Sequence, residues 1–137
     1  MGCIKLSIKT RNAMLQALSD MGPATLEIYA GGQPVNAEEP LAPDNILFGT
    51  LTFSNPSASD PVDGVLTFNS ITAAPSCLAN GIAVWGRVKN SVGQVLLDGD
   101  VRADGTGLIN FNRNDFVMGG PIMLTSFILQ IPTNIYF

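Results

Sequence analysis

Hydrophobic and polar residues alternate with a period of two along most of this chain, the pattern of half-buried β-strands. Residues 3–9 set Ile4, Leu6 and Ile8 against polar neighbours, and the lysines among those neighbours suit an edge strand. The same kind of pattern predicts strands at 24–30, 46–53, 64–69, 82–89, 95–101, 108–112 and 122–131. Residues 90–93 between two of these segments predict a hairpin turn.

The period changes to that of a helix in a single stretch, which predicts a three-turn helix over about residues 11–21. Thr10 suits the N-cap, and Gly22-Pro23 is expected to end the helix. The apolar positions at helical spacing are Ala13, Met14, Ala17, Leu18 and Met21. Eight strands and one helix predict a mainly β fold, an antiparallel sandwich or jelly-roll-like barrel whose open end the helix covers.

Composition makes the surface of this fold unusual. The 137 residues are expected to form one domain, with residues 1–9 and 132–137 as candidate assembly arms. Only 13% of the residues are charged while 46% are hydrophobic, so the surface must consist largely of Ser, Thr, Asn and Gly. Such a surface promotes association, and we expect neighbouring proteins to cover much of it.

Charge and hydropathy exclude two classes of partner. The net charge is −4 and the seven Lys and Arg residues are dispersed, which excludes a nucleic-acid partner. No apolar run approaches the roughly 18 residues that a membrane helix needs, so no membrane partner is expected. Cys3 and Cys77 are expected to be free, buried thiols unless the fold brings them together.

Catalytic chemistry has few places in this sequence. The chain has no histidine, which removes the Ser-His-Asp and Cys-His arrangements and the usual zinc ligand sets, and no glycine-rich phosphate loop is present. The acidic stretch Asp98–Gly105 fails as an EF-hand loop because Arg102 stands at the fifth position. Asp98 and Asp100 could share a sheet face as catalytic carboxylates, but an exposed strand end leaving the sheet at Gly99 and a turn at 104–107 explain the stretch better. We therefore expect no enzyme, metal or cofactor.

Two polar or aromatic features admit a binding interpretation. Trp85 is expected to anchor the core or a sheet face with its indole N–H bonded to a carbonyl, and a sugar-stacking platform is the alternative. The segment from Asn110 to Asn114, together with Tyr29, offers amides and an aromatic face for a glycan. A strand end followed by an Asx-type turn is the simpler interpretation of that segment.

The end of the sequence is apolar, where a free terminus is usually polar and frayed. The bulky residues after Pro132 either fold back over the core or dock on a neighbouring subunit. Together with the alternating N-terminal segment they predict an assembly interface formed by Ile4, Leu6, Ile8, Ile135, Tyr136 and Phe137. Strand pairing of the N-terminal segment with a neighbour is one way in which it could form.

The order of these segments resembles a group of small tailed-phage virion proteins that are usually encoded beside the major capsid protein. The resemblance begins with the helical "RNAMLQALSDMG" and the following "PATLEIYAG", and continues through "GVLTFNSITAAP", "NGIAVWGRVKNSVGQVLLDGDV" and "LTSFILQIP". It covers roughly residues 11–131 and contains no catalytic signature. Residues 3–9 and 135–137 lie outside it, which makes them candidates for the attachment of this particular chain.

The resemblance implies a structural part of a tailed bacteriophage particle, namely a decoration or cement protein that stabilises the capsid. It implies as partners the chain itself, in a homo-oligomer with a trimer favoured, and the major capsid protein. The expected location is the capsid surface of the virion, after synthesis in the host cytoplasm. The alternative is a receptor- or glycan-binding module of a phage head or tail fibre, which an exposed Trp85 would favour and a buried one would oppose.

Overall fold

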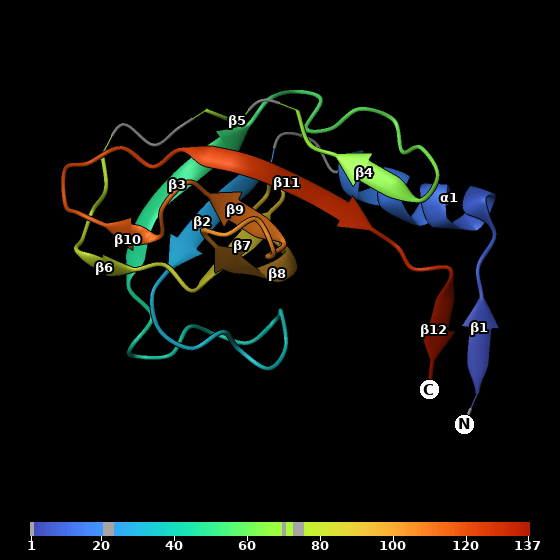
Figure 1. Ribbon diagram of the computed structural model, residues 1–137, viewed down its shortest axis with the longest axis horizontal. Coiled ribbons are helices and arrows are strands. Elements are labelled where there is room, and N and C mark those ends of the chain that lie inside the picture. Colours follow the sequence, from blue (N-terminus) through green and yellow to red (C-terminus); the bar gives the residue numbers. More distant parts are fainter. Residues whose placement is uncertain (1, 21–23, 70, 73–75) are drawn as a thin grey trace.

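The computed structural model describes residues 2–20, 24–69, 71–72 and 76–137, and it is mainly β, as predicted. Within these residues it has one helix, α1, and twelve short strands, which follow one another along the chain as shown in Figure 1. The bounds are β1 Cys3–Lys5, α1 Ile8–Ser19, β2 Thr25–Tyr29, β3 Leu47–Phe53, β4 Val65–Thr67, β5 Ile71–Thr72, β6 Gly81–Ile82, β7 Trp85–Lys89, β8 Val95–Arg102, β9 Ile109–Phe111, β10 Asp115–Phe116, β11 Leu124–Gln130 and β12 Asn134–Tyr136.

Eight of these strands form one curled sheet in the order β4-β11-β9-β8-β7-β2-β3-β5. Neighbouring strands are antiparallel except β8 and β9, which pair in parallel at Val101↔Ile109 and Arg102↔Asn110. The sequence did not predict this parallel pair. The loop between the two strands folds back tightly, and at Gly107 a Cβ atom would lie 2.9 Å from the Cβ of Arg102, so glycine is the residue that fits there.

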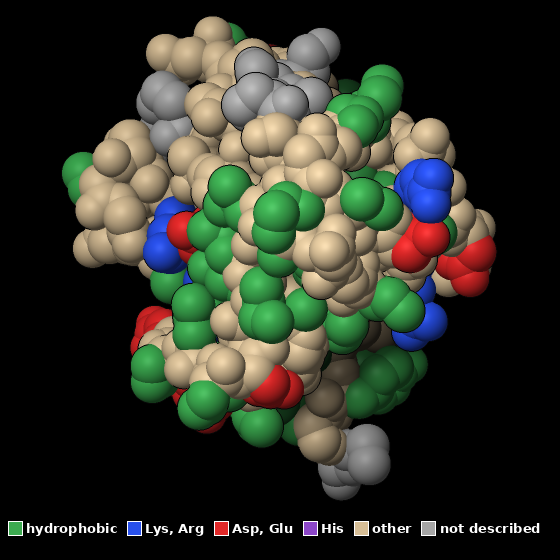
Figure 2. Space-filling model, turned by 90° about the vertical axis from the view of Figure 1, so that its left-hand side faces the viewer, with side chains coloured by type: hydrophobic (Ala, Val, Ile, Leu, Met, Phe, Trp, Pro, Cys, Tyr) green, Lys and Arg blue, Asp and Glu red, His purple; other side chains and the backbone are tan. Residues whose placement is uncertain are grey.

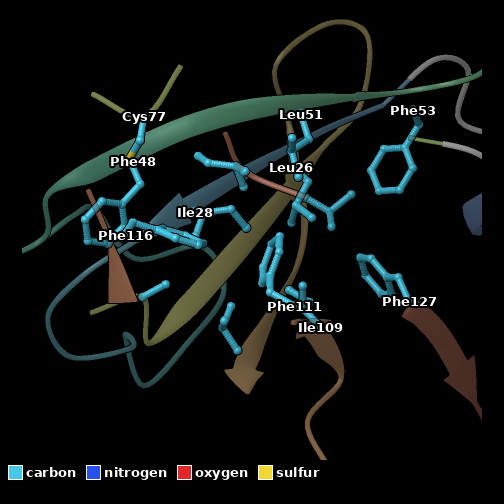
Figure 3. Packing of buried hydrophobic residues seen from close by; sticks show 14 of the residues in the cluster. Leu26, Ile28, Phe48, Leu51, Phe53, Cys77, Ile109, Phe111, Phe116 and Phe127 are labelled. Atoms are coloured by element: carbon cyan, nitrogen blue, oxygen red, sulfur yellow. The ribbon is translucent and has the colours of Figure 1, made fainter. Parts of the chain in front are cut away.

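The two ends of the sheet approach each other around a shared aromatic cluster. Phe53 of β3, Phe127 of β11 and Phe68 just after β4 have ring centroids 4.3–6.0 Å apart. The main core lies inside this curl, and Figure 3 shows its large side chains meeting from strands on all sides. The alternation along each strand determines which side chains point into the core. Leu26 and Ile28 of β2 are fully buried, and burying each such side chain contributes roughly 1.5–3 kcal/mol to the free energy of unfolding.

Helix α1 lies against β4 at one end of the sheet, as Figure 1 shows. Leu15 is fully buried there with Ala58 and Leu66. The predicted start of the helix is wrong by one turn, because Ser7 is the N-cap and its hydroxyl accepts a hydrogen bond of 3.1 Å from the backbone N–H of Thr10. The helix ends at Ser19 with Asp20 as its C-cap. Met21 and the predicted stop at Gly22-Pro23 lie outside the described residues.

Several strand boundaries differ from the predicted ones. The strand predicted over residues 3–9 ends at Lys5, since Ser7 caps the helix that Ile8 begins. The strand predicted over residues 82–89 is two strands, because the backbone turns from β10 to β2 between them: Ala83 N–H donates to Asn114 O, and Val84 N–H donates to Tyr29 O. The predicted hairpin turn at residues 90–93 is confirmed, with β7 and β8 antiparallel on either side. The short strands β5, β10 and β12 were not predicted.

Candidate assembly surfaces

The two terminal segments form a ribbon that projects from the body of the molecule (Figure 1). Strand β1 pairs antiparallel with β12 in the register Cys3↔Tyr136, Ile4↔Ile135 and Lys5↔Asn134. Two further hydrogen bonds extend the pairing at both ends, from Leu6 N–H to Thr133 O (2.7 Å) and from Phe137 N–H to Gly2 O (2.9 Å). We call residues 2–6 and 133–137 the terminal ribbon. It belongs to a separate two-stranded sheet rather than to the curled sheet.

The register gives the terminal ribbon two different faces. Side chains directly opposite in an antiparallel pair lie on the same face, and faces alternate along each strand. One face therefore carries the apolar residues Ile4, Leu6, Ile135 and Phe137, which we call the apolar ribbon face. The other face carries Cys3, Lys5, Asn134 and Tyr136.

This apolar ribbon face is open to solvent within the single chain. Ile4 is 45% exposed and Phe137 is 67% exposed, while Leu6 and Ile135 are half-buried. A two-stranded ribbon is marginally stable in water unless its face is covered. The ribbon thus presents apolar area whose burial would stabilise both the ribbon and a contact with another protein.

Four of the six predicted interface residues lie together on this face, and two do not. Tyr136 is 66% exposed but lies on the opposite face, beside Cys3. Ile8 is half exposed and belongs to the first turn of α1, because the expected strand stops before it. The C-terminal segment does not fold over the core and is not unpaired. It pairs with the N-terminal strand of the same chain.

A second apolar surface lies at the opposite end of the molecule and was missed by the sequence reasoning. Hydrogen bonds join residues 77–83 to residues 114–120, and β6 pairs with β10 between them. Figure 2 shows hydrophobic side chains gathered over this end. We call the surface the β6–β10 patch, and it consists of Leu78, Ile82, Val117, Met118 and Met123. The available signal was the apolar pair Val117-Met118 just before Gly119-Gly120-Pro121, where a turn would normally be polar.

The acidic stretch has a structural role rather than that of an exposed strand end. Strand β8 continues through Gly99, which pairs with Gly86, so the strand does not leave the sheet there as expected. Asp98 forms an ion pair with Arg87 at 2.8 Å, and both side chains are about 95% buried. Asp100 accepts a hydrogen bond of 3.0 Å from Leu108 N–H and so anchors the loop that precedes β9.

The predicted turn after β8 is confirmed and depends on Asp104. Its carboxylate accepts hydrogen bonds from the hydroxyl (2.6 Å) and the backbone N–H (3.0 Å) of Thr106. These bonds favour the charged form and lower the pKa of Asp104 below its usual value. Among the residues that the structure describes, no group of three or more Cys, Asp and Glu side chains is placed to hold a metal ion.

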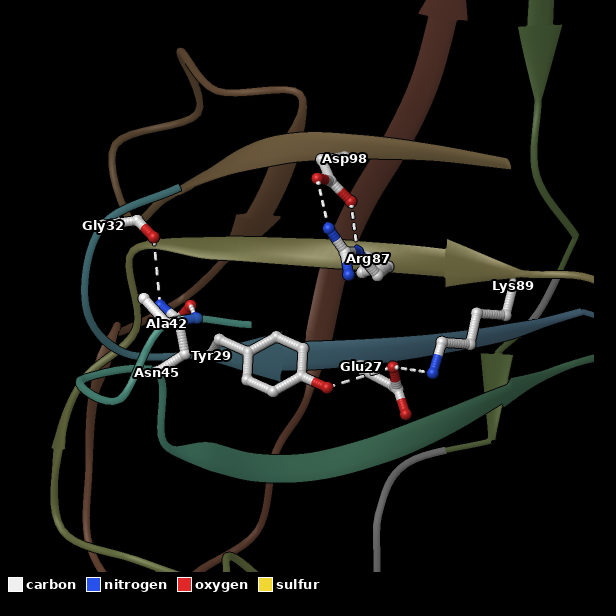
Figure 4. Close-up of polar contacts among 8 residues, drawn as sticks. All are labelled: Glu27, Tyr29, Gly32, Ala42, Asn45, Arg87, Lys89 and Asp98. Carbon is white, nitrogen blue, oxygen red and sulfur yellow. Dashed lines mark hydrogen bonds and ion pairs between the residues drawn. The ribbon is translucent and has the colours of Figure 1, made fainter. Parts of the chain in front are cut away.

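Trp85 and Tyr29 lie on the sheet face that points away from the core, where they form a buried cluster with charged residues (Figure 4 shows Tyr29 and its polar neighbours). Their rings stack with centroids 4.8 Å apart, and the Arg87 guanidinium lies 5.2 Å from the Trp85 ring. Trp85 is 0% exposed and Tyr29 is 3% exposed, so neither offers a sugar-stacking platform. The expected carbonyl partner of the Trp85 indole N–H is absent among the described residues.

The polar groups around this cluster shift the pKa of Tyr29. Burial, the negative charge of Glu27 and the hydrogen bond that the Tyr29 hydroxyl donates to it (3.1 Å) raise the pKa to about 12. Lys89 forms an ion pair with the same carboxylate at 3.0 Å. The loop after β2 lies beside the cluster and is held by Asn45, whose amide donates to the carbonyl oxygens of Ala30 and Gly32. Figure 4 shows the bond to Gly32.

Asn110, the first residue of the candidate glycan-binding segment, is buried and fully engaged. Its amide N–H₂ donates to Gly107 O (2.8 Å) and Ser126 Oγ (3.2 Å), and its amide oxygen accepts from Gly107 N–H (3.0 Å). It therefore fixes the loop between β8 and β9. Of the two cysteines, Cys77 is buried as expected while Cys3 is exposed, and both are free.

The described helix is too short and too polar to cross a membrane. Comparisons with protein-family models, with curated proteins and with solved structures found no match to this chain.

Proposed function

We propose that this chain is a structural virion protein of a tailed bacteriophage, a decoration or cement protein that stabilises the capsid through protein–protein contacts. The observation that carries the proposal is the terminal ribbon, an amphipathic two-stranded element whose apolar face is uncovered in the single chain. The resemblance of residues 11–131 to small virion proteins supports the phage setting, and the ribbon lies outside the part that resembles them.

The proposed attachment uses the ribbon as an arm on the major capsid protein or on a neighbouring copy. Covering Ile4, Leu6, Ile135 and Phe137 would remove apolar area from water at about 25 cal/mol per Å². The docking entropy offsets part of this gain, so a lattice that holds many copies at fixed places is a favourable setting for such an arm. The low charge of the whole chain, 13%, fits a subunit whose surface is extensively covered.

The alternative of a glycan-binding module loses its proposed platform. Trp85 and Tyr29 are buried, and Asn110 uses its amide within the chain, so of the residues named for that role only those from Asn112 to Asn114 remain at the surface. We therefore retain the assembly role as the proposed function.

The test is to find the chain in purified particles of the phage that encodes it and to remove its arm. We expect mass spectrometry of the particles to find the chain in many copies per capsid. Particles made with a chain that lacks residues 132–137 should lose it, while a chain with Val35→Asp, which alters a side chain that is 91% exposed in a loop, should be retained. Absence of the unaltered chain from particles would refute the virion role, and full occupancy by the truncated chain would refute the arm.

A further inference from the structure

The β6–β10 patch gathers exposed apolar side chains at one end of the molecule. Its members are all between 57% and 62% exposed: Leu78, Ile82, Val117, Met118 and Met123. At on the order of 100 Å² of open surface for each large side chain, the patch reaches roughly 500 Å², within the range of the largest patch on a typical monomer. A standard interface buries about 800 Å² on each partner, so this patch could supply most of one.

The patch also has a shape and a charge that restrict what can bind to it. A hollow of about 170 Å³ lies beside it, with apolar walls from Phe116, Val117, Pro121 and Met123 and a polar rim that includes Arg113 and Asp115. The two charged residues of the rim bind each other through two hydrogen bonds of 3.0 and 2.9 Å, so they offer no net charge to a partner. Methionine side chains adapt their shape to what they contact. The surface is therefore suited to an uncharged apolar element that can insert a bulky side chain.

The apolar ribbon face has these properties. It carries the side chains of Ile4, Leu6, Ile135 and Phe137 and no charged side chain, since Lys5 lies on the opposite face. Phe137 is the most exposed of the four and has the size to enter the hollow. The ribbon and the β6–β10 patch lie at opposite ends of the long axis of the molecule, as Figure 1 shows. A chain therefore cannot cover its own patch with its own ribbon.

From this complementarity we propose that the β6–β10 patch of one copy receives the apolar ribbon face of a second copy. The inference rests on the proposed assembly role and names the partner of the ribbon. Each copy has one ribbon and one patch, so the contact joins unlike surfaces head-to-tail and repeats from copy to copy, as a ring where the rotation closes and as a filament where it does not. The ribbon gains a cover for its open face, and the patch loses its exposure to water in the same contact.

The test measures self-association of the isolated full chain by light scattering and sedimentation over a range of concentrations. The variants are Val117→Asp in the patch, Phe137→Asp in the ribbon and Val35→Asp as a control at another exposed valine. All three side chains are more than 60% exposed, so each variant should fold, which circular dichroism checks. We expect the unaltered chain and the control to associate alike, and each of the other two variants to weaken association at least tenfold.

An equimolar mixture of the two interface variants gives the sharpest result. The Val117→Asp chain keeps a sound ribbon and the Phe137→Asp chain keeps a sound patch, so together they can form one junction and no more. We expect a one-to-one dimer from the mixture, although each variant alone is monomeric at that concentration. A mixture that stays monomeric would overturn the head-to-tail contact.

Two other outcomes would overturn the inference without touching the virion role, which is measured separately in purified particles. One is an unaltered chain that stays monomeric at millimolar concentration. The other is a Val117→Asp chain that associates as well as the unaltered one, since the ribbon would then bind a different surface. Association through ribbon and patch by a chain that is absent from particles would instead support the inference and refute the virion role.

Discussion

Removing the carboxylate of Asp98 is expected to destabilise the fold severely, because it leaves a cation in a buried place. The carboxylate accepts hydrogen bonds from Arg87 Nε (2.8 Å) and Nη2 (3.0 Å), and the two side chains are 4% and 5% exposed. Asp98 also raises the pKa of Arg87 above its already high value, so the guanidinium stays charged at every pH at which the protein is folded. The Asp98→Ala variant removes the carboxylate that binds this guanidinium and leaves only the charge of Glu27, its cross-strand neighbour, nearby.

The size of the expected Tm shift follows from the burial of the ion pair and from the chain length. Breaking a buried ion pair by removing one partner costs about 3–5 kcal/mol of unfolding free energy. For 137 residues, an unfolding entropy of about 2.1 cal/mol/K per residue converts each kcal/mol into roughly 3.5 °C of Tm. We therefore expect Asp98→Ala to lower the Tm by about 10–17 °C. Thermal melts followed by circular dichroism at neutral pH measure this shift.

A matched control comes from the exposed pair of the same residue types. Asp115 accepts two hydrogen bonds of similar length from Arg113, but the two side chains are 63% and 65% exposed. Asp115→Ala should therefore melt close to the unaltered chain, because solvent screens such a pair. Replacing both buried partners, with Arg87→Met and Asp98→Leu, should recover most of the loss. The reasoning fails if Asp98→Ala lowers the Tm by less than about 3 °C, or if the double variant melts below the single one.

Three further predictions address the loops and the outer cluster. Because the pKa of Tyr29 is raised to about 12 from 10.0, the free energy of unfolding should fall as the pH rises from about 10 to 12. Denaturant titrations over this pH range should show a smaller fall for Tyr29→Phe, which has no hydroxyl to ionise. Thr106→Val should raise the pKa of Asp104 toward its usual value, which carboxyl NMR over a pH series would show; an unchanged pKa would contradict the assigned cause. Gly107→Ala should cost about 1–3 kcal/mol in chemical denaturation, since its Cβ would meet Arg102, whereas Gly32→Ala in open space should cost far less; equal losses would refute the steric argument.

The strands that the sequence predicted well are those whose burial follows from local alternation. Leu26 and Ile28 of β2 face the core, and Glu27 between them faces outward, as their order along the chain indicates. The start of α1 was misplaced for an equally local reason. Ser7 and Thr10 are both good N-cap residues, and Ile8 continues the apolar alternation of the preceding strand, so the pattern did not distinguish the two starts.

What the sequence could not predict depends on residues that meet from distant parts of the chain. Asp98 looked exposed because its stretch is acidic, but β7 places Arg87 opposite it and the pair is buried. Trp85 was expected to donate to a carbonyl, and its ring instead stacks on Tyr29 with the Arg87 guanidinium nearby. Cross-strand neighbours of this kind follow from register, which alternation alone does not specify.

For the candidate surfaces, too, the sequence indicated some features, and others required the pairing of distant residues. The apolar terminal residues were identified from their composition, but their separation into two faces required the pairing of Ile4 with Ile135. The β6–β10 patch was not predicted because Val117 and Met118 belong to a glycine-rich segment with the composition of a loop. Such a segment has no hydrophobic periodicity from which burial or exposure could be inferred.

The pairing of β1 with β12 also sets an order of events during synthesis and folding. Cys3–Lys5 leaves the ribosome long before its partner Asn134–Tyr136, so the first strand stays an unpaired edge while the strands between them form. Closing a contact across nearly the whole chain is slow and is best made after the intervening strands have folded. The ribbon should therefore form last and open first, and its amide protons should exchange with solvent well before those of β2 and β7.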